Sequence, residues 1–175
     1  MEEIKKIKEL MASDRPVEWD GLPDIDLYMD QVVSYLLRQT TGGKEPAITS
    51  AMINNYVKDE LLPRASGKRY HREHLAYLTA IGLLKNVLTV RDMKLLLSSE
   101  IQEGQEREFY QKFLGGVDEA FSRVDESISG ELPEEALGEM AMRLALRSCA
   151  AKAACEQILA VMRARNPEED PMAKK

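Results

Sequence analysis

Apolar residues recur every three or four positions along most of this chain, which is the spacing of amphipathic helices. By this pattern, we expect helices over residues 2–11, 24–39, 50–60, 73–88, 90–101, 105–129 and 133–165. Aromatic residues make up only 6% of the chain, so the core must rely on aliphatic side chains, which favours helices over a sheet sandwich. The sequence therefore predicts a mainly α fold, with at most a two-stranded wing near "KRY" at 68–70.

Polar residues mark the points where several of these helices begin. Thr49 and Thr89 stand where their side chains can cap the helices that follow, and Asp24 or Asp26 can do the same for the helix over 24–39. The apolar stripe predicted for that helix comprises Ile25, Met29, Val32, Val33 and Leu36. Trp19, which precedes it, is expected to tuck against the domain that follows.

The C-terminal third contains long helical patterns with interruptions. The pair Gly115-Gly116 is expected to weaken or bend the helix over 105–129. Phe109, Phe113 and Phe121 lie on one side of that helix, where they can form a core, a dimer seam or the lining of a small-molecule or partner pocket. We expect a packed helical bundle here, one that can form a homodimer.

The helix over 50–60 separates two kinds of side chain. At about 100° per residue, Thr49, Ile53, Tyr56 and Val57 fall on one side, and Ala51, Asn54, Asn55 and Lys58 fall on the other. Asparagine can bond adenine with two hydrogen bonds in the major groove, alanine can touch a thymine methyl group, and lysine can meet guanine or phosphate. The polar side is therefore either a solvated face or a surface that reads DNA.

A short basic stretch follows this helix and favours the second interpretation. Lys68, Arg69, Tyr70, His71 and Arg72 are consecutive. Cations together with hydroxyl or imidazole donors suit contacts with phosphate, which position a protein on DNA without reading its sequence. With Thr49 and Ser50 at the start of the helix, these residues complete the predicted DNA-binding surface.

The charge distribution agrees with one local cationic surface. The whole chain carries a formal net charge of −6, which by itself argues against nucleic acid. Residues 44–94, however, contain nine Lys and Arg against five Asp and Glu, whereas both flanking segments are acidic. A basic centre between acidic flanks indicates one specific surface rather than general binding to polyanions.

The same region resembles known families. The stretches "AITSAMINNYVKDELLP" and "GKRYHREHLAYLTAIGLLKNVLTVRDMKLLL" are similar to the winged helix-turn-helix of MerR-type regulators. Leu61-Leu62 match the leucine pair that ends its recognition helix, Lys68 and Tyr70 match its wing, and Asn54-Asn55 stand where it commonly has Arg-Tyr. "LPDIDLYMDQVVSYL" and "KRYHREHL" also resemble a bacterial family described as domain of unknown function 1836. These resemblances imply a DNA-binding fold and no known activity.

Four segments follow from the pattern and the resemblance. They are an N-terminal helix and linker (1–23), a winged helix-turn-helix domain (24–102), a C-terminal helical region for dimerisation or sensing (103–166) and a disordered tail (167–175). The leading hypothesis is a transcriptional regulator that binds double-stranded DNA, dimerises and responds to a small-molecule or protein effector. One alternative is a winged-helix module for protein–protein interaction without DNA binding. Another is a ligand-binding helical domain with a vestigial winged helix.

Other kinds of chemistry lack the necessary residues. His71 and His74 share a helix face, but no third ligand accompanies them, so neither a metal site nor a cofactor is predicted. No nucleophile–base pair, phosphate-binding loop or dinucleotide fingerprint is present, so we do not expect an enzyme. Cys149 and Cys155 lie on different faces of a helix, which indicates small buried apolar residues rather than a disulfide. The charged start and the short apolar runs predict a cytoplasmic protein without a membrane segment.

Overall fold

The computed structural model describes residues 2–13, 15–39, 48–128 and 133–165. The described residues are mainly helical, which confirms the predicted fold class at that level. The chain divides into two compact units, one of which is the continuous segment Ser13–Glu119. The other combines Met1–Ala12 with Ala120–Lys175. The turn predicted at 40–46 and the tail predicted at 167–175 lie outside the described residues.

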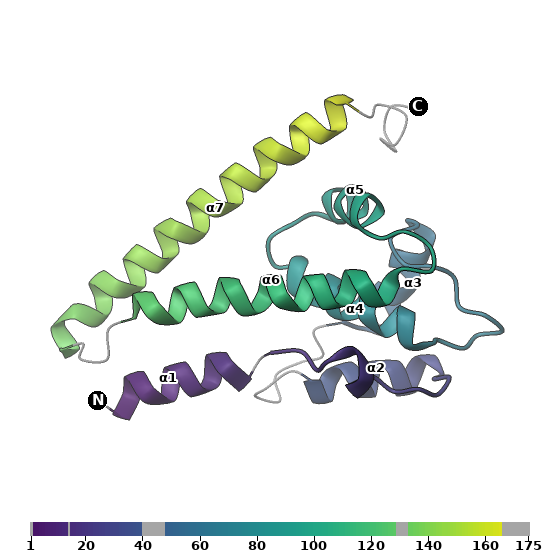
Figure 1. The fold of residues 1–175 in the computed structure, drawn as a ribbon, viewed down its shortest axis with the longest axis horizontal. Helices are drawn as coiled ribbons and strands as arrows, with labels where there is room; N and C mark the ends of the chain where they lie inside the picture. The colour runs from purple at the N-terminus through teal and green to yellow at the C-terminus, as the bar shows by residue number, and fades with distance from the viewer. Residues whose placement is uncertain (1, 14, 40–47, 129–132, 166–175) are drawn as a thin grey trace. The chain divides into compact units, whose positions relative to one another are not determined.

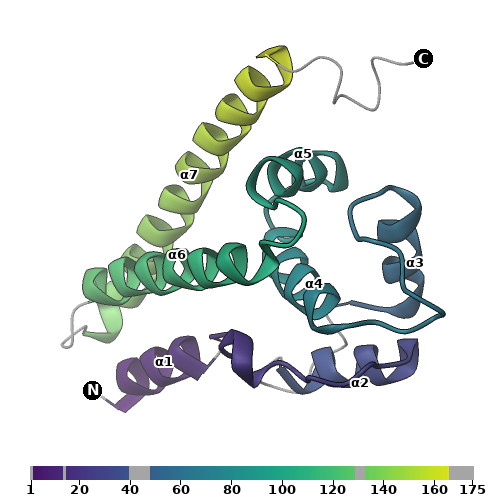
Figure 2. The same ribbon diagram turned by 45° about the vertical axis from the view of Figure 1, so that its right-hand side comes forward.

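Seven α-helices account for most of the described chain, and Figures 1 and 2 show their order. They are α1 (Glu2–Ser13), α2 (Met29–Gln39), α3 (Ser50–Lys58), α4 (Arg72–Leu84), α5 (Val90–Glu100), α6 (Glu106–Ser127) and α7 (Leu137–Arg165). Two 3₁₀ turns, η1 (Trp19–Gly21) and η2 (Glu134–Ala136), precede α2 and α7. Among the described residues there is no strand, only two isolated β-bridges, so the predicted two-stranded wing is reduced to single bridges.

Side-chain caps fix the starts of α3 and α5 as the sequence predicts. The Thr49 hydroxyl accepts a hydrogen bond from the backbone N–H of Met52, and the Thr89 hydroxyl accepts one from Asp92. Each bond satisfies an amide that the first turn of a helix would otherwise leave unpaired. These two predicted helix starts are therefore confirmed.

The start of α2 differs from the prediction. The helix begins at Met29 rather than at residue 24, and the side chain of Gln31 accepts the hydrogen bond from the Tyr28 backbone N–H at 2.9 Å. The preceding residues stay out of the helix because Leu27 pairs with Tyr70, exchanging two backbone hydrogen bonds of 2.9 and 2.8 Å. Ile25, expected in the apolar stripe, is consequently 67% exposed.

The core of the unit Ser13–Glu119 is built around α4. Leu75, Leu78 and Ile81 on this helix are completely buried. Further apolar side chains come from α2, α3, α5 and α6. Figures 1 and 2 show α2, α3 and α5 arranged around α4 and the N-terminal part of α6. Trp19 is buried as expected, with its ring edge-on to Tyr110 at 6.0 Å between centroids. A single aliphatic core therefore supports the positions of α3 and the basic stretch.

The unit formed by the two ends of the chain has few buried side chains. Ile4, Ile128 and Leu159 are its buried apolar residues among those described. The Lys8 ammonium also contacts the Asp125 carboxylate at 3.2 Å. Cys149 is exposed rather than buried, which corrects the expectation for this residue, because α7 leaves most of its surface uncovered.

Two further features of α6 and α7 bear on the predictions. The pair Gly115-Gly116 does not interrupt α6, which runs unbroken from Glu106 to Ser127. Both glycines are exposed, so they cost helix propensity without opening a gap in the packing. No helix in the described ranges is long and apolar enough to cross a membrane.

Tyr110 allows a test of one partly buried hydrogen bond in the core. Its ring is fully buried, its hydroxyl donates a 2.9 Å hydrogen bond to the Val17 carbonyl, and burial raises its pKa to about 12. We expect Tyr110→Phe to lower the free energy of unfolding by about 1 kcal/mol, because the Val17 carbonyl loses its partner while the ring packing is kept. Urea unfolding followed by the fluorescence of Trp19, the only tryptophan, measures this change.

Tyr28→Phe is the matched control for this experiment. Tyr28 is 50% exposed, so its hydroxyl can bond water in either state. Its replacement should change the free energy of unfolding by less than about 0.5 kcal/mol. Equal losses in the two variants would contradict a specific role for the Tyr110 hydroxyl.

Candidate nucleic-acid interface

α3 presents one buried face and one exposed face. Ile53 and Tyr56 are 0% and 4% exposed, so they anchor the helix to the core. The exposed side carries small and polar residues and one cation: Ser50, Ala51, Asn54, Asn55 and Lys58. Thr49, also exposed, is occupied as the N-cap. The division of faces predicted from the sequence is therefore present, and the two adjacent asparagines point away from the core.

The turn that follows is held in a strained backbone conformation. Ser66 and Arg69 exchange two backbone hydrogen bonds, of 3.1 and 2.9 Å, across Gly67 and Lys68. Both central residues have positive φ, 55° for Gly67 and 66° for Lys68, as a type I′ turn requires. Glycine adopts this conformation freely, but lysine does so at a cost. The tight turn therefore displays Lys68 at its tip, exposed to solvent.

Tyr70 lies in the core rather than on the predicted surface. Its side chain is 5% exposed and packs edge-on against His74. Its backbone is the partner of Leu27 in the β-bridge. Tyr70, which was predicted to hold phosphate, is therefore a core residue that fixes the backbone position of the basic stretch.

The neighbouring basic side chains pair with an acidic segment that comprises Asp20, Asp24 and Asp26. Arg72 is only 18% exposed, lies 3.3 Å from the Asp24 carboxylate and 3.9 Å from that of Asp20, and stacks over the Trp19 ring. The His71 Nδ1 lies 2.5 Å from the Asp26 carboxylate. Asp24 and Asp26, which the sequence suggested as helix caps, therefore balance the charge of the basic stretch.

Arg69 is more loosely held than Arg72. Its guanidinium lies 3.9 Å from the Asp26 carboxylate and 5.5 Å from the centre of the Tyr28 ring, and its side chain is 52% exposed. Such exposed pairs contribute at most about 1 kcal/mol, so an anion can compete for this arginine. Arg69 thus remains available beside Lys68, whereas Arg72 is committed to the protein's own acids.

The ring of His74 contacts backbone atoms through both of its nitrogens, whereas the ring of His71 contacts the Asp26 carboxylate. The His74 Nδ1 accepts a 3.0 Å hydrogen bond from the His71 backbone N–H, and the His74 Nε2 lies 3.3 Å from the Arg64 carbonyl. Nδ1 therefore lacks a proton and Nε2 carries one. Within the described residues no group of three or more potential ligands is close enough to hold a metal ion.

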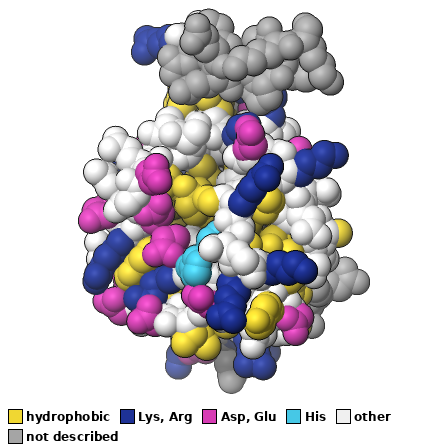
Figure 3. Space-filling view, turned by 90° about the vertical axis from the view of Figure 1, so that its right-hand side faces the viewer, with side chains coloured by type: hydrophobic (Ala, Val, Ile, Leu, Met, Phe, Trp, Pro, Cys, Tyr) yellow, Lys and Arg dark blue, Asp and Glu magenta, His cyan; other side chains and the backbone are white. Residues whose placement is uncertain are grey.

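The predicted surface is therefore present only in part. The structure exposes Ser50, Ala51, Asn54, Asn55, Lys58, Lys68 and Arg69, and it withdraws Tyr70, His71 and Arg72 to differing degrees. Figure 3 looks onto this end of the molecule and shows basic and acidic side chains interspersed around a histidine. The surface is consequently mixed in charge rather than continuously basic.

The sequence contains a weak signal for the pairing of the aspartates with the basic stretch, but the helical pattern of the same residues obscured it. Four aspartates at positions 20, 24, 26 and 30 precede a basic run at 68–72. Opposite charge alone does not specify that two segments meet. The alternation that would mark Leu27 as an extended residue covers too few positions to compete with the helical pattern.

Comparison with known proteins gives one match. A family model described as domain of unknown function (DUF1836) matches residues 17–113, more than half of the chain. This range holds η1, α2 to α5, the acidic segment and the basic stretch. No curated protein and no solved structure gives a significant match.

The burial of His74 predicts a pH dependence of stability. Burial lowers the pKa of His74 below its usual 6.5, so the unfolded chain binds a proton more readily than the folded one. Stability should therefore be complete above pH 6.5 and fall as the pH drops below it, by up to about 1.4 kcal/mol per pH unit. Urea unfolding at pH 7.5, 6.5 and 5.5 measures the effect.

His74→Gln isolates this contribution, because glutamine cannot titrate. The variant should be less stable than the wild type at pH 7.5, and the gap should narrow at pH 5.5. Parallel curves for the two proteins across this range would show that His74 does not cause the loss.

Proposed function

The chain belongs to the DUF1836 family, which is defined without an assigned function, and from the geometry of α3 we propose that it is a DNA-binding transcriptional regulator. The single observation that carries this proposal is the exposed face of α3. Ala51, Asn54, Asn55 and Lys58 are all exposed on a helix whose opposite side is anchored by Ile53 and Tyr56. A helix so presented has the dimensions to enter the major groove.

The residue types on this face suit base recognition. Each asparagine can donate to N7 and accept from N6 of the same adenine, and the Ala51 methyl can meet that of thymine. Asparagine is also a mediocre helix former, so two in succession on an exposed face lower the helix propensity of α3. The cost is consistent with a recognition role for the amides.

Lys68 and Arg69 supply the contacts with phosphate. Lys68 has no ion pair with another described residue, and Arg69 is half-exposed. A lysine at positive φ is disfavoured where asparagine or glycine would fit, which supports a need for its charge. These two cations, with Lys58, position the recognition helix without reading bases. Dimerisation and the response to an effector are further parts of this proposal.

One observation favours a second function, a protein-interaction module without DNA binding. Asp20, Asp24 and Asp26 hold Arg72 and His71 in place and leave few free cations on this side. A mixed surface of this kind also suits a protein partner. The two functions are separated by whether binding to duplex DNA is measurable and depends on salt.

Asn55→Ala tests base recognition. We expect the variant to lose most of its preference for selected genomic sites over random duplex, by about tenfold, while its affinity for random DNA stays within a factor of two. Fluorescence anisotropy with both duplexes measures the ratio. The variant should fold at least as well as the wild type, because alanine favours helices.

Gln111→Ala is the matched control, since Gln111 is an exposed amide on α6. It should leave the preference for selected sites unchanged. Equal losses on selected and random DNA in Asn55→Ala would contradict a base-reading role for Asn55.

Lys68→Asn tests phosphate contact without straining the turn, because asparagine tolerates positive φ. We expect the slope of log affinity against log salt to become shallower by about 0.9, the change for one lost phosphate contact. Lys6→Asn, which removes an exposed lysine from α1, is the control and should keep the wild-type slope.

An unchanged slope in Lys68→Asn would remove this lysine from the interface. The absence of salt-dependent binding to any genomic duplex by the wild type would reject the DNA-binding proposal and leave the protein-interaction module in its place.

A further inference from the structure

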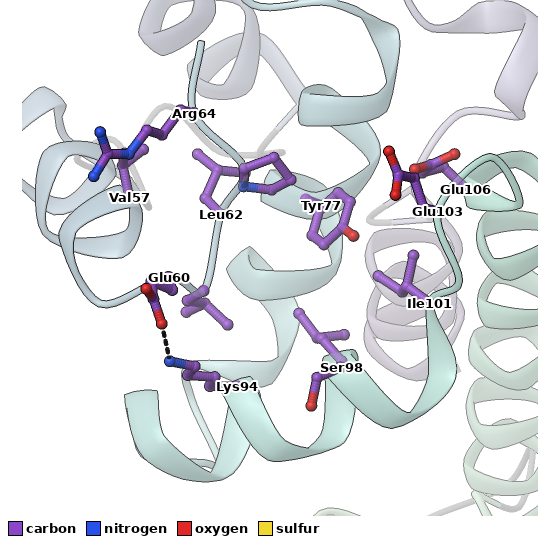
Figure 4. Close-up of a pocket in the computed structure, with 13 residues that line it drawn as sticks. Val57, Glu60, Leu62, Arg64, Tyr77, Lys94, Ser98, Ile101, Glu103 and Glu106 are labelled. Carbon is purple, nitrogen blue, oxygen red and sulfur yellow. Dashed lines mark hydrogen bonds and ion pairs between the residues drawn. The ribbon is translucent and has the colours of Figure 1, made fainter. Parts of the chain in front are cut away.

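A pocket of about 560 Å³ lies beside the C-terminal end of α3, between α3, α4 and α5 (Figure 4). Four of its lining residues, Leu61, Leu62, Leu97 and Ile101, are at most 8% exposed and give it an apolar base. The volume lies within the range of roughly 300 to 1,000 Å³ that is usual for small-molecule sites. The pocket can therefore hold the apolar body of a small ligand.

The positive and negative charges that line the pocket balance at one side but not at the other. Glu60 and Lys94 form an ion pair with a separation of 2.8 Å, so they largely neutralise each other. Arg64 also lines the pocket, but Figure 4 shows its guanidinium directed towards Val57, away from Tyr77. What remains at the other side is a pair of carboxylates, Glu103 and Glu106.

These two carboxylates face the pocket without a basic partner. Neither Glu103 nor Glu106 forms an ion pair with any described residue, and the Glu106 carboxylate accepts one hydrogen bond, from the Gly104 backbone N–H at 3.3 Å. Figure 4 shows both on the same side of the pocket as the Tyr77 hydroxyl. Burial, and then the negative charge of Glu106, raises the pKa of Tyr77, which places that charge near the phenol. This side of the pocket is therefore electronegative and bears an aromatic ring.

Glu60 supplies an independent sign that the pocket wall is constrained. It has a φ of 57° at the position just after α3 where glycine is usual, and the next two amides both donate to the Tyr56 carbonyl. A glycine here would relax the backbone but would leave the Lys94 ammonium unneutralised beside the pocket. The strained glutamate thus keeps the pocket electronegative.

We propose that this pocket binds a small organic cation, with its apolar body on Leu61, Leu97 and Ile101 and its ammonium group between Glu103, Glu106 and the face of Tyr77. Two carboxylates and an aromatic face are the groups that favour an organic ammonium ion over a neutral or anionic analogue. The inference goes beyond the proposed function and does not depend on DNA binding.

Three probes of similar shape test the sign of the charge. They are tryptamine, its neutral alcohol tryptophol and the anionic indole-3-propionate. We expect tryptamine to bind about tenfold more tightly than tryptophol, and indole-3-propionate to bind most weakly. Isothermal titration calorimetry measures the affinities, and methyl shifts of Leu61, Leu97 and Ile101 in NMR spectra locate the site.

Single carboxylate replacements identify the groups that recognise the cation. Glu103→Gln and Glu106→Gln should each weaken tryptamine about tenfold while leaving tryptophol unchanged. Glu108→Gln is the matched control, because Glu108 is an exposed carboxylate in the first turn of α6 and does not line the pocket. Urea unfolding curves check that all three variants stay folded.

Several outcomes would overturn the proposal. These are the absence of tryptamine binding at about 1 mM, equal affinities for the three probes, shifts confined to methyl groups outside the pocket, or a loss in Glu108→Gln equal to that in the other two variants.

Discussion

The architecture around α3 depends on two backbone hydrogen bonds between Leu27 and Tyr70. They join segments more than forty residues apart, and each strand of this bridge is a single residue. The bridge holds residues 24–28 out of the α2 helix and brings the acidic segment alongside the basic stretch. Because Tyr70 and Leu27 are both buried, the pairing is shielded from water, where its net contribution would be smaller. The contacts of Arg72 and His71 with the aspartates follow from it.

That pairing divides the basic residues into two groups with different physical roles. Arg72 and His71 follow Tyr70 in the chain and contact the aspartates, and Arg72 also lies over the Trp19 ring. These two residues therefore contribute to the fold. Lys68 precedes the bridge, at the tip of a tight turn, and Arg69 lies between Lys68 and the bridge residue Tyr70. A net charge of −6 is therefore compatible with a small cationic projection, because most of the positive charge nearby is already balanced within the same unit.

Helix periodicity and capping predicted α3 and α5 closely, since both signals are local and both caps act within three residues of Thr49 and Thr89. The same reasoning failed for residues 24–28, where helix-compatible residues are held extended by a bridge to a distant segment. Tyr70 shows the corresponding limit for the site. Its position in a basic run indicated an exposed ligand-binding residue, but only tertiary structure decides which side chains of such a run turn inward. The pocket beside α3 draws residues from three stretches of the sequence, residues 57–64, Tyr77 and residues 94–106, and only the fold brings them together.

The unit built from the two ends of the chain has a consequence for biosynthesis. Ser13–Glu119 emerges from the ribosome as one continuous segment and can acquire its core at once. Helix α1 is translated first, yet the Asp125 carboxylate that its Lys8 contacts lies 117 positions downstream. At roughly 5 to 20 residues per second, the nascent helix waits about 6 to 23 seconds for that contact. Helix α1 therefore makes this contact only after the whole segment Ser13–Glu119 has been synthesised.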